Sequence, residues 1–258
     1  MESSFKPILF DAPREQGDIE LYFLHDIHAG AREFDEGRFS RLKKHILAED
    51  NRYVIWLGDV LNNAIPGSKT EMFDQTMNPH EQKEWFCDQL RDFEGRSILV
   101  VPGNHEYNRT TRAAGLYPLY DCCARMQQSE IYRSEFAFVD IGVGVRKRDP
   151  GAQNHYVGFC VHQAKDLRNY GAADWIDGID WLAFGHDHEP KSRPRAKLVY
   201  DTKRKLVYQR DVETVNSGSF LRYGGYGAKG GYRPQAAKMY KIILGGDERV
   251  CTSSSYSA

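Results

Sequence analysis

Five short apolar runs recur along the chain, and each ends at a polar cluster. They span residues 21–24, 53–57, 98–102, 157–161 and 181–184 and are rich in branched and aromatic side chains. Runs of this length and composition are typical of buried strands in α/β sheets. Ligands of such sheets bind at the carboxyl ends of the strands. We therefore expect the polar residues that follow the runs to meet at one edge of a sheet.

Helical spacing appears between these strands. Residues 36–49 place apolar side chains on one face of a predicted helix. Residues 78–81, Asn-Pro-His-Glu, combine an Asn cap, a Pro at the first helical position and a Glu three residues after the cap, which predicts a second helix that ends at Gly95. Residues 109–127 are predicted to be helical, and a short polar helix is expected between the fourth and fifth runs.

The second half of the chain is dominated by strand patterns. A hairpin is predicted from residues 197–200 and 206–208, with further strands at 212–215 and 239–244. Residues 245–258 are expected to form a mobile tail. Helices alternate with strands early and strands dominate late, which favours two packed sheets with helices outside. We expect a single domain over residues 1–258, with its core at about 19–244.

Composition narrows the class of protein. The 258 residues are 41% hydrophobic and 28% charged, and the net charge of -1 argues against wholesale attraction to nucleic acid or an anionic membrane. No apolar run reaches membrane-spanning length, and the first residues lack a signal-peptide pattern. Five cysteines without a C-x-x-C pair favour reduced thiols and a cytoplasmic location.

The polar residues after the five runs suit a metal site. They are two aspartates, one asparagine and five histidines: Asp26, His28, Asp59, Asn104, His105, His162, His186 and His188. Alternate residues of an extended segment project to one side, so Asp26 and His28 can act together. Carboxylate and imidazole suit a first-row divalent ion. Gly58 permits a tight turn, so that Asp59 can offer one oxygen to each of two metals.

Five blocks carry a family resemblance: Asp26-x-His28, Gly58-Asp59, Gly103-Asn104-His105-Glu106, His162 and Gly185-His186-Asp187-His188. In order and spacing they resemble the calcineurin-like metallophosphoesterase superfamily. The match runs from about residue 21 to residue 188, with a further echo at 215–219. The resemblance implies an α/β fold, a four-layer αββα sandwich of two mixed sheets flanked by helices, and a pair of divalent ions, with Mn expected and Fe, Zn or Ni as alternatives.

The resemblance also implies roles for these residues. One metal would take Asp26, His28, Asp59 and His188, and the other Asp59, Asn104, His162 and His186. His105 would be the general acid or the group that orients phosphate. The implied reaction is in-line attack of a metal-bridging hydroxide on phosphorus, without a phosphoenzyme. Asn104, Arg109 and Arg222 are candidate substrate contacts.

Two departures from the family pattern bear on the substrate. Many relatives carry an acidic or imidazole group three residues after the bridging Asp, where this chain has Asn62. The Asn62 amide could hold His105 by a hydrogen bond but would not raise the His105 pKa as a carboxylate would. Protein phosphatases of the superfamily carry an Arg shortly after the bridging Asp, and residues 60–66 contain none. We therefore expect a phosphodiesterase acting on a small phosphodiester or nucleotide, rather than a protein phosphatase.

Alternative interpretations stay open at this point. Gly58-Asp59-Val60-Leu61 resembles repair exonucleases of the superfamily, and the basic residues 191–210 could guide nucleic acid or simply form a solvated hairpin. The Gly/Tyr/Arg-rich residues 222–233 could be a lid whose rings stack on a base, or a plain surface loop. A metal-binding scaffold without activity is the non-enzyme alternative. No obligatory protein partner and no membrane contact is indicated.

Overall fold

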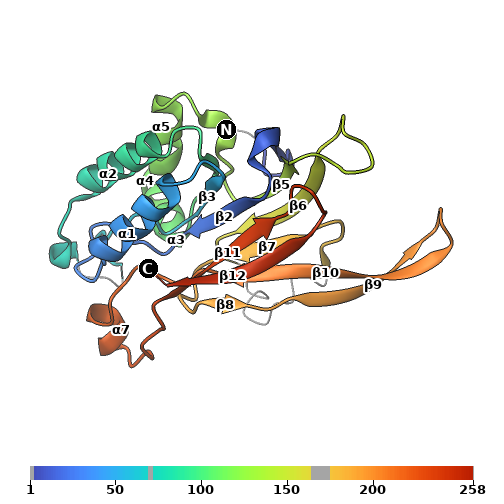
Figure 1. Cartoon of the computed structure of the whole chain (residues 1–258). Coiled ribbons are helices and arrows are strands. Elements are labelled where there is room, and N and C mark those ends of the chain that lie inside the picture. The colour runs from blue at the N-terminus through green and yellow to red at the C-terminus, as the bar shows by residue number, and fades with distance from the viewer. Residues whose placement is uncertain (1–2, 69–71, 164–174, 258) are drawn as a thin grey trace.

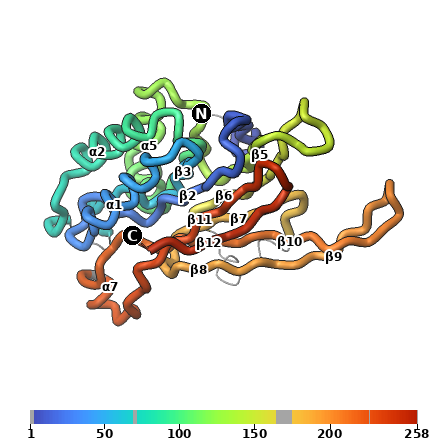
Figure 2. Tube along the Cα trace, viewed as in Figure 1, coloured from blue at the N-terminus to red at the C-terminus, as the bar shows by residue number. Residues whose placement is uncertain are grey.

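Two β-sheets pack face to face in the computed structural model, which describes residues 3–68, 72–163 and 175–257. Helices lie against the first sheet, and a long hairpin extends from the second (Figure 1). The tube view shows the same arrangement, with the last strand beside the strands of the first sheet (Figure 2).

The first sheet has five strands in the order β12-β11-β2-β3-β4. They are β2 (Ile19–Leu24), β3 (Arg52–Leu57), β4 (Ser97–Val101), β11 (Lys238–Leu244) and β12 (Cys251–Ser257). Strands β2, β3 and β4 are parallel, whereas β11 is antiparallel to both of its neighbours. This sheet is therefore mixed, as the sequence predicts.

The second sheet has the order β1-β5-β6-β7-β10-β8, with β9 paired to β10. Its strands are β1 (Ile8–Asp11), β5 (Phe136–Val143), β6 (Asn154–Val161), β7 (Trp181–Phe184), β8 (Lys191–Ser192), β9 (Arg195–Asp201) and β10 (Leu206–Asn216). Parallel and antiparallel pairs both occur. The predicted hairpin is confirmed, and the strand expected at 212–215 is the continuation of β10.

The apolar runs are continuous because both faces of the first sheet are buried. In β3, Val54 and Trp56 join the cluster beneath the helices. Tyr53, Ile55 and Leu57 instead join the cluster between the two sheets. Successive side chains of a strand point to opposite faces. Each residue of the run thus has a packing partner.

Three helices cover the outer face of the first sheet: α1 (Glu36–Leu47), α2 (Pro79–Asp92) and α5 (Pro118–Arg125). The capping box predicted at Asn78 is present, since Asn78 accepts from the Glu81 N–H and the Glu81 side chain accepts from the Asn78 N–H. Shorter helical elements are α3 (Asn104–Glu106), a π-helical turn (Tyr107–Thr111), α4 (Arg112–Ala114), α7 (Gly225–Lys229) and the 3-10 turns Arg14–Gln16, Met72–Asp74 and Ser129–Ile131.

The helix predicted over 109–127 is interrupted. Gly115 adopts a left-handed φ of 67°, and Pro118 then starts α5. The helix predicted between β6 and β7 falls largely on residues 164–174, which lie outside the described residues. On the outer face of the second sheet, Phe159 and Leu182 pack with Ile176 and Ile179. The fold prediction of two mixed sheets with helices is confirmed.

The prediction of a mobile tail over 245–258 is wrong for Cys251–Ser257. These residues form β12, which pairs with β11 from Lys238↔Ser257 to Leu244↔Cys251. The serine-rich sequence hides the strand because main-chain hydrogen bonds carry the pairing and need no apolar side chains. The core also begins before residue 19, since β1 pairs with β5 and Ile8 is buried.

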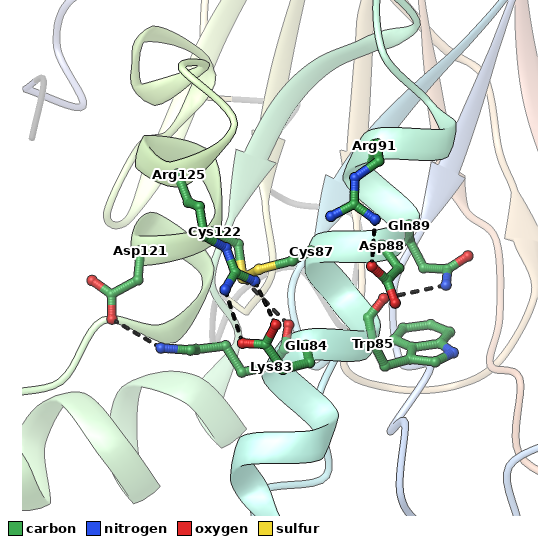
Figure 3. Close-up of a disulfide and its surroundings, with 10 residues drawn as sticks. All are labelled: Lys83, Glu84, Trp85, Cys87, Asp88, Gln89, Arg91, Asp121, Cys122 and Arg125. Carbon is green, nitrogen blue, oxygen red and sulfur yellow. Dashed lines mark hydrogen bonds and ion pairs between the residues drawn. A yellow bond between two sulfur atoms is a disulfide. The ribbon is translucent and has the colours of Figure 1, made fainter.

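The prediction of reduced thiols is wrong for Cys87 and Cys122. Cys87 on α2 and Cys122 on α5 form a disulfide that joins the two helices (Figure 3). The Arg125–Glu84 and Lys83–Asp121 ion pairs join the same helices beside it. The two cysteines are 35 residues apart, so only the packing of α2 against α5 brings them together. Cys123, Cys160 and Cys251 are free thiols.

Among the described residues, no helix is both long and apolar enough to cross a membrane.

Reduction of the Cys87–Cys122 disulfide should lower the free energy of unfolding by about 3–4 kcal/mol, because the crosslink restricts the unfolded chain. Urea unfolding with and without a thiol reductant measures the difference. A Cys87→Ala/Cys122→Ala variant is the control and should show no response to the reductant. Equal unfolding midpoints of the unmodified protein in both conditions would contradict a stabilising crosslink.

Candidate metal centre

Polar side chains from both sheets meet beyond the ends of five strands. Asp26, Asp59 and Asn104 follow β2, β3 and β4 of the first sheet. His162 follows β6 and His186 follows β7 of the second sheet. Because β2, β3 and β4 run parallel, as do β6 and β7, their carboxyl ends lie at one edge of each sheet. The structure thus brings together the residues that the sequence placed at strand ends.

Asp26 lies at the centre of one group. Its Oδ1 atom is 3.3 Å from His188 Nε2, 3.9 Å from His28 Nε2 and 4.0 Å from His162 Nε2. Its Oδ2 atom accepts the main-chain N–H of His186 at 2.8 Å. The Asp26 side chain is fully buried. Burial acts to raise the pKa of Asp26, but the imidazoles of His188, His25 and His162 outweigh it and hold the pKa well below its usual range.

Asp59 lies between two further groups. Its Oδ2 atom is 3.3 Å from His162 Nε2 and 3.8 Å from His105 Nε2, while Oδ1 accepts the His105 N–H at 2.8 Å. Asn104 Oδ1 is 3.3 Å from His162 Nε2. Potential ligand atoms gather in three overlapping sets: Asp26, His28 and His188; His28, Asp59 and His105; Asp59, His162 and His186. Asp59 and His28 each belong to two of these sets, and of the two only Asp59 has two carboxylate oxygens, one of which it could offer to each of two ions.

These residues fit divalent cations. Asp26 Oδ1 and His186 Nδ1 are buried without a hydrogen-bond partner among the described residues. A buried polar group without a partner costs about 1–3 kcal/mol. Carboxylate, amide oxygen and imidazole are suitable ligands for first-row divalent ions. Cations between these groups would satisfy the orphaned atoms and the clustered imidazoles together.

The backbone at the site is unusual. Asp26, His28, Asp59, His186 and His188 have φ angles of 49°, 52°, 48°, 76° and 57°. Left-handed φ is uncommon outside glycine and costs about 1–3 kcal/mol per residue. The expected extended geometry of Asp26-x-His28 is therefore wrong. The two side chains still converge, because both residues turn through the left-handed region.

Gly58 and Gly103 let two loops approach each other. Gly58 has a φ of 75°, and a Cβ atom there would overlap the backbone of Gly103. A Cβ at Gly103 would in turn overlap the Asp59 backbone and carboxylate. The tight turn expected at Gly58 is present, and this contact fixes the position of Asp59.

Glu106 supports the Asp59 loop from below. Its carboxylate accepts the N–H groups of Asp59 at 3.0 Å, Leu61 at 2.9 Å and Gly103 at 2.8 Å. Burial and the neighbouring Asp59 raise the pKa of Glu106 to about 7. These three main-chain contacts identify Glu106 as a residue that supports the candidate ligand Asp59.

His25 is a supporting residue that the sequence did not reveal. Its Nδ1 atom lies 2.7 Å from Asp26 Oδ2. Its Nε2 atom accepts the Ser217 N–H at 3.1 Å. The side chain of Asn216, the residue before Ser217, donates to Asp187 Oδ1 at 2.6 Å. The only signal in the sequence was the family resemblance at residues 215–219, and this resemblance does not indicate that they contact His25.

His105 is held by Asn62, but not as predicted. His105 Nδ1 lies 2.9 Å from the main-chain carbonyl oxygen of Asn62, whereas the Asn62 amide donates to Gln75 Oε1 at 3.1 Å. Arg109 donates to the same carbonyl. The predicted role of the Asn62 side chain is therefore wrong, because the loop turns that side chain toward Gln75 and leaves the carbonyl facing His105. Burial lowers the pKa of His105 to about 4.

Five of the candidate ligands line a cavity of about 890 Å³: His28, Asp59, Asn104, His186 and His188. His105, Asn104 and Arg109 lie along it, and Arg222 contributes from the segment that contains α7. None of the described residues 191–210 lines this cavity. Several of their cations are paired: Lys191 with Asp187, Lys197 with Asp177 and Arg210 with Asp180. The basic residues 191–210 thus do not line the cavity, although Lys191 pairs with Asp187, which does.

The chain belongs to the calcineurin-like phosphoesterase family, whose model matches residues 21–190. Comparison with curated proteins gave no significant match. A solved structure described as "Crystal structure of a putative diadenosine tetraphosphatase" is 13% identical, with a TM-score of 0.41, over 97% of this chain and 98% of that chain. Family membership implies a phosphoric ester hydrolase with a His/Asp metal centre.

Replacing Gly58 by Ala should destabilise the protein by more than about 2 kcal/mol, because strain in the left-handed region adds to overlap with the Gly103 backbone. Gly115→Ala is the matched control, since Gly115 adopts a left-handed conformation with a similar φ of 67° and no atom lies within 4 Å of the position that a Cβ would take there. The control should lose only about 1 kcal/mol. Urea unfolding measures both, and equal losses would show that close approach at Gly58 is unimportant.

Proposed function

We propose that this protein is a dinuclear metal-dependent phosphodiesterase that hydrolyses a small phosphodiester or a nucleotide-type phosphate. The observation that supports it best is the overlap of the ligand sets at Asp59, beside a cavity large enough for an organic ligand. Asp26, His28, Asp59 and His188 would hold one ion, and Asp59, Asn104, His162 and His186 the other. Mn²⁺ is the expected metal.

Two such ions supply a nucleophile at neutral pH and neutralise phosphate charge. The chain itself supplies orientation. The His105 ring lies 3.8 Å from Asp59 Oδ2 through Nε2, and its Nδ1 faces the Asn62 carbonyl. In the doubly protonated ring, that carbonyl would hold the Nδ1 proton, and the Nε2 proton could bond to phosphate or pass to the leaving oxygen. Arg109 lines the cavity beside His105 and could add positive charge.

A diester substrate is favoured over a phosphoprotein for two reasons. The cavity extends past the candidate ligands to Arg222 and Tyr223, which leaves room for a second ester group. Residues 60–66 supply no Arg next to the bridging Asp59. The chain retains His105 and all of the candidate metal ligands, which weighs against an inactive scaffold. A cytoplasmic location stays a prediction.

The nuclease alternative has weaker support. The basic residues 191–210 that could have guided a polyanion do not line the cavity, and several are paired with carboxylates. Nuclease activity therefore stays a second candidate, to be checked with labelled single- and double-stranded DNA and Mn²⁺. Absence of cleavage would remove it.

The chelator-treated protein should bind two Mn²⁺ ions per chain, and Asp59→Asn should bind at most one, because one carboxylate serves both ions. Titration calorimetry, with metal analysis after dialysis, gives the stoichiometry. Asp88→Asn is the control, since Asp88 lies on α2 and pairs with Arg91. Failure of the unmodified protein to take up Mn²⁺ would favour the scaffold alternative.

The Mn²⁺-loaded protein should hydrolyse bis(p-nitrophenyl) phosphate, and EDTA should abolish the turnover. Asp59→Asn should lower kcat/KM at least a hundredfold and His105→Ala about a hundredfold or more, in line with general acid–base contributions. His80→Ala, at an exposed position on α2, should leave the rate unchanged. A loss below tenfold in Asp59→Asn would refute the bridging assignment.

A further inference from the structure

Many of the cavity-lining residues that are not candidate metal ligands come from one segment. Residues 219–237, here called the flap, contain α7 and connect the end of the second sheet to β11 (Figure 1). Arg222, Tyr223, Tyr232 and Arg233 of the flap line the cavity. Because this segment borders the same cavity as the candidate metal ligands, the alternative of a plain surface loop is disfavoured.

Arg38 ties both ends of the flap to one point. Its guanidinium donates to the carbonyl oxygen of Ser219 at 2.8 Å and to that of Lys238 at 3.1 Å. Arg38 is only 6% exposed, and its guanidinium carbon lies 5.6 Å from the centre of the Phe220 ring. The guanidinium is planar and always charged, and it presents its N–H donors in a fixed geometry, so that it can hold two carbonyls at once. Arg38 thus fixes the distance between the ends of the flap.

Hydrogen bonds also attach the first part of the flap to the main chain of Asp26, a candidate metal ligand. Phe220 N–H and the Ser219 hydroxyl both donate to the carbonyl oxygen of Asp26, at 3.1 Å and 3.0 Å. On the other side, Asp35 N–H donates to the Phe220 carbonyl and Arg222 N–H to the Glu33 carbonyl, each at 2.8 Å. The position of Arg222 and Tyr223 is therefore set relative to Asp26.

The side chains on this wall combine three kinds of chemistry. Arg222 and Arg233 are cationic, and Tyr223 and Tyr232 are aromatic and each 58% exposed. Glu33, which lies against the flap at Gly225, adds a carboxylate to the cavity lining. Tyrosine rings can stack on any of the nucleobases, because every base has an aromatic face. A carboxylate accepts hydrogen bonds from sugar hydroxyls or exocyclic amines. A methyl ester shares the phosphate that the arginines could bind, but it has no ring for the tyrosines and no hydroxyl or amine for the carboxylate.

We propose that the flap is a second subsite that binds the nucleoside part of a phosphodiester or nucleotide, and that Arg38 is a positioning residue that holds this subsite in register with the metal ligands. The proposal rests on the function proposed above for the same cavity. It names the substrate class, a nucleoside ester, and places its recognition on the flap and on the opposing residues 33–35.

The test compares two ligands that share a phosphate and differ in the nucleoside. Calorimetric titration of the Mn²⁺-supplemented full chain with thymidine 5′-monophosphate should give a Kd at least tenfold below that for methyl phosphate. Tyr223→Ala/Tyr232→Ala should reduce this preference at least fivefold. Tyr200→Ala is the matched control, because Tyr200 is 56% exposed and lies on β9 away from the cavity lining. The control should keep the full preference.

Rates of hydrolysis provide a second test of the subsite, independent of the binding measurements. Thymidine 5′-(p-nitrophenyl phosphate) and methyl p-nitrophenyl phosphate release the same leaving group, so the ratio of their kcat/KM values reports recognition of the other ester group. Arg38→Met should lower this ratio at least fivefold, mainly through KM for the nucleoside ester, with two Mn²⁺ ions still bound. Should that buried substitution prevent folding, the exposed tyrosines carry the test alone.

The outcomes distinguish the two proposals. Tight thymidine 5′-monophosphate binding that depends on the tyrosines, with neither ester hydrolysed, would support the subsite and refute the phosphodiesterase. Hydrolysis of both esters with equal efficiency, together with equal Kd values for the two phosphates, would overturn the subsite and leave the phosphodiesterase standing. Equal losses of preference in the double variant and in Tyr200→Ala would also overturn it.

Discussion

Packing of the two sheets against each other is the constraint on which the site depends. Asp26, Asp59 and Asn104 come from the first sheet, whereas His162, His186 and His188 come from the second. The apolar cluster between the sheets sets their spacing, because cores are close-packed and resist displacement. At the rim of this interface, Asp26 Oδ2 accepts the His186 N–H, a direct bond between the sheets. A ligand set split in this way exists only while both sheets are docked.

Strain and polar support are concentrated at the same rim. Five candidate ligands have left-handed φ, which the surrounding structure must offset. Glu106 helps by accepting three main-chain N–H groups, including that of Asp59. His25 links Asp26 to the Ser217 N–H and so connects the first sheet with the end of β10. These buried contacts give strained ligands a fixed geometry before any ion binds, which lowers the cost of reorganisation on binding.

The sequence predicted what depends on local pattern and strand-end chemistry. Apolar runs located the core strands, the Asn78 capping signature located α2, and the polar residues after the strands proved to lie together. Features that depend on tertiary packing were missed. The Cys87–Cys122 pair needs two helices to dock, β12 is held by main-chain bonds, and the partner of His105 is a carbonyl, which any residue type at position 62 would supply. Residue identity carries no information about such main-chain contacts.

The two walls of the cavity are built in different ways. The metal side is fixed by sheet packing and by buried groups, so a substitution there acts on the fold and on the ligands together. The flap is attached at its ends, through Arg38, the Asp26 carbonyl and residues 33–35, while the rings of Tyr223 and Tyr232 remain more than half exposed. If the proposed subsite is correct, changes in the middle of the flap should alter the binding of the nucleoside without moving Asp26. The attachment through Arg38 thus separates the proposed nucleoside subsite from the candidate metal ligands.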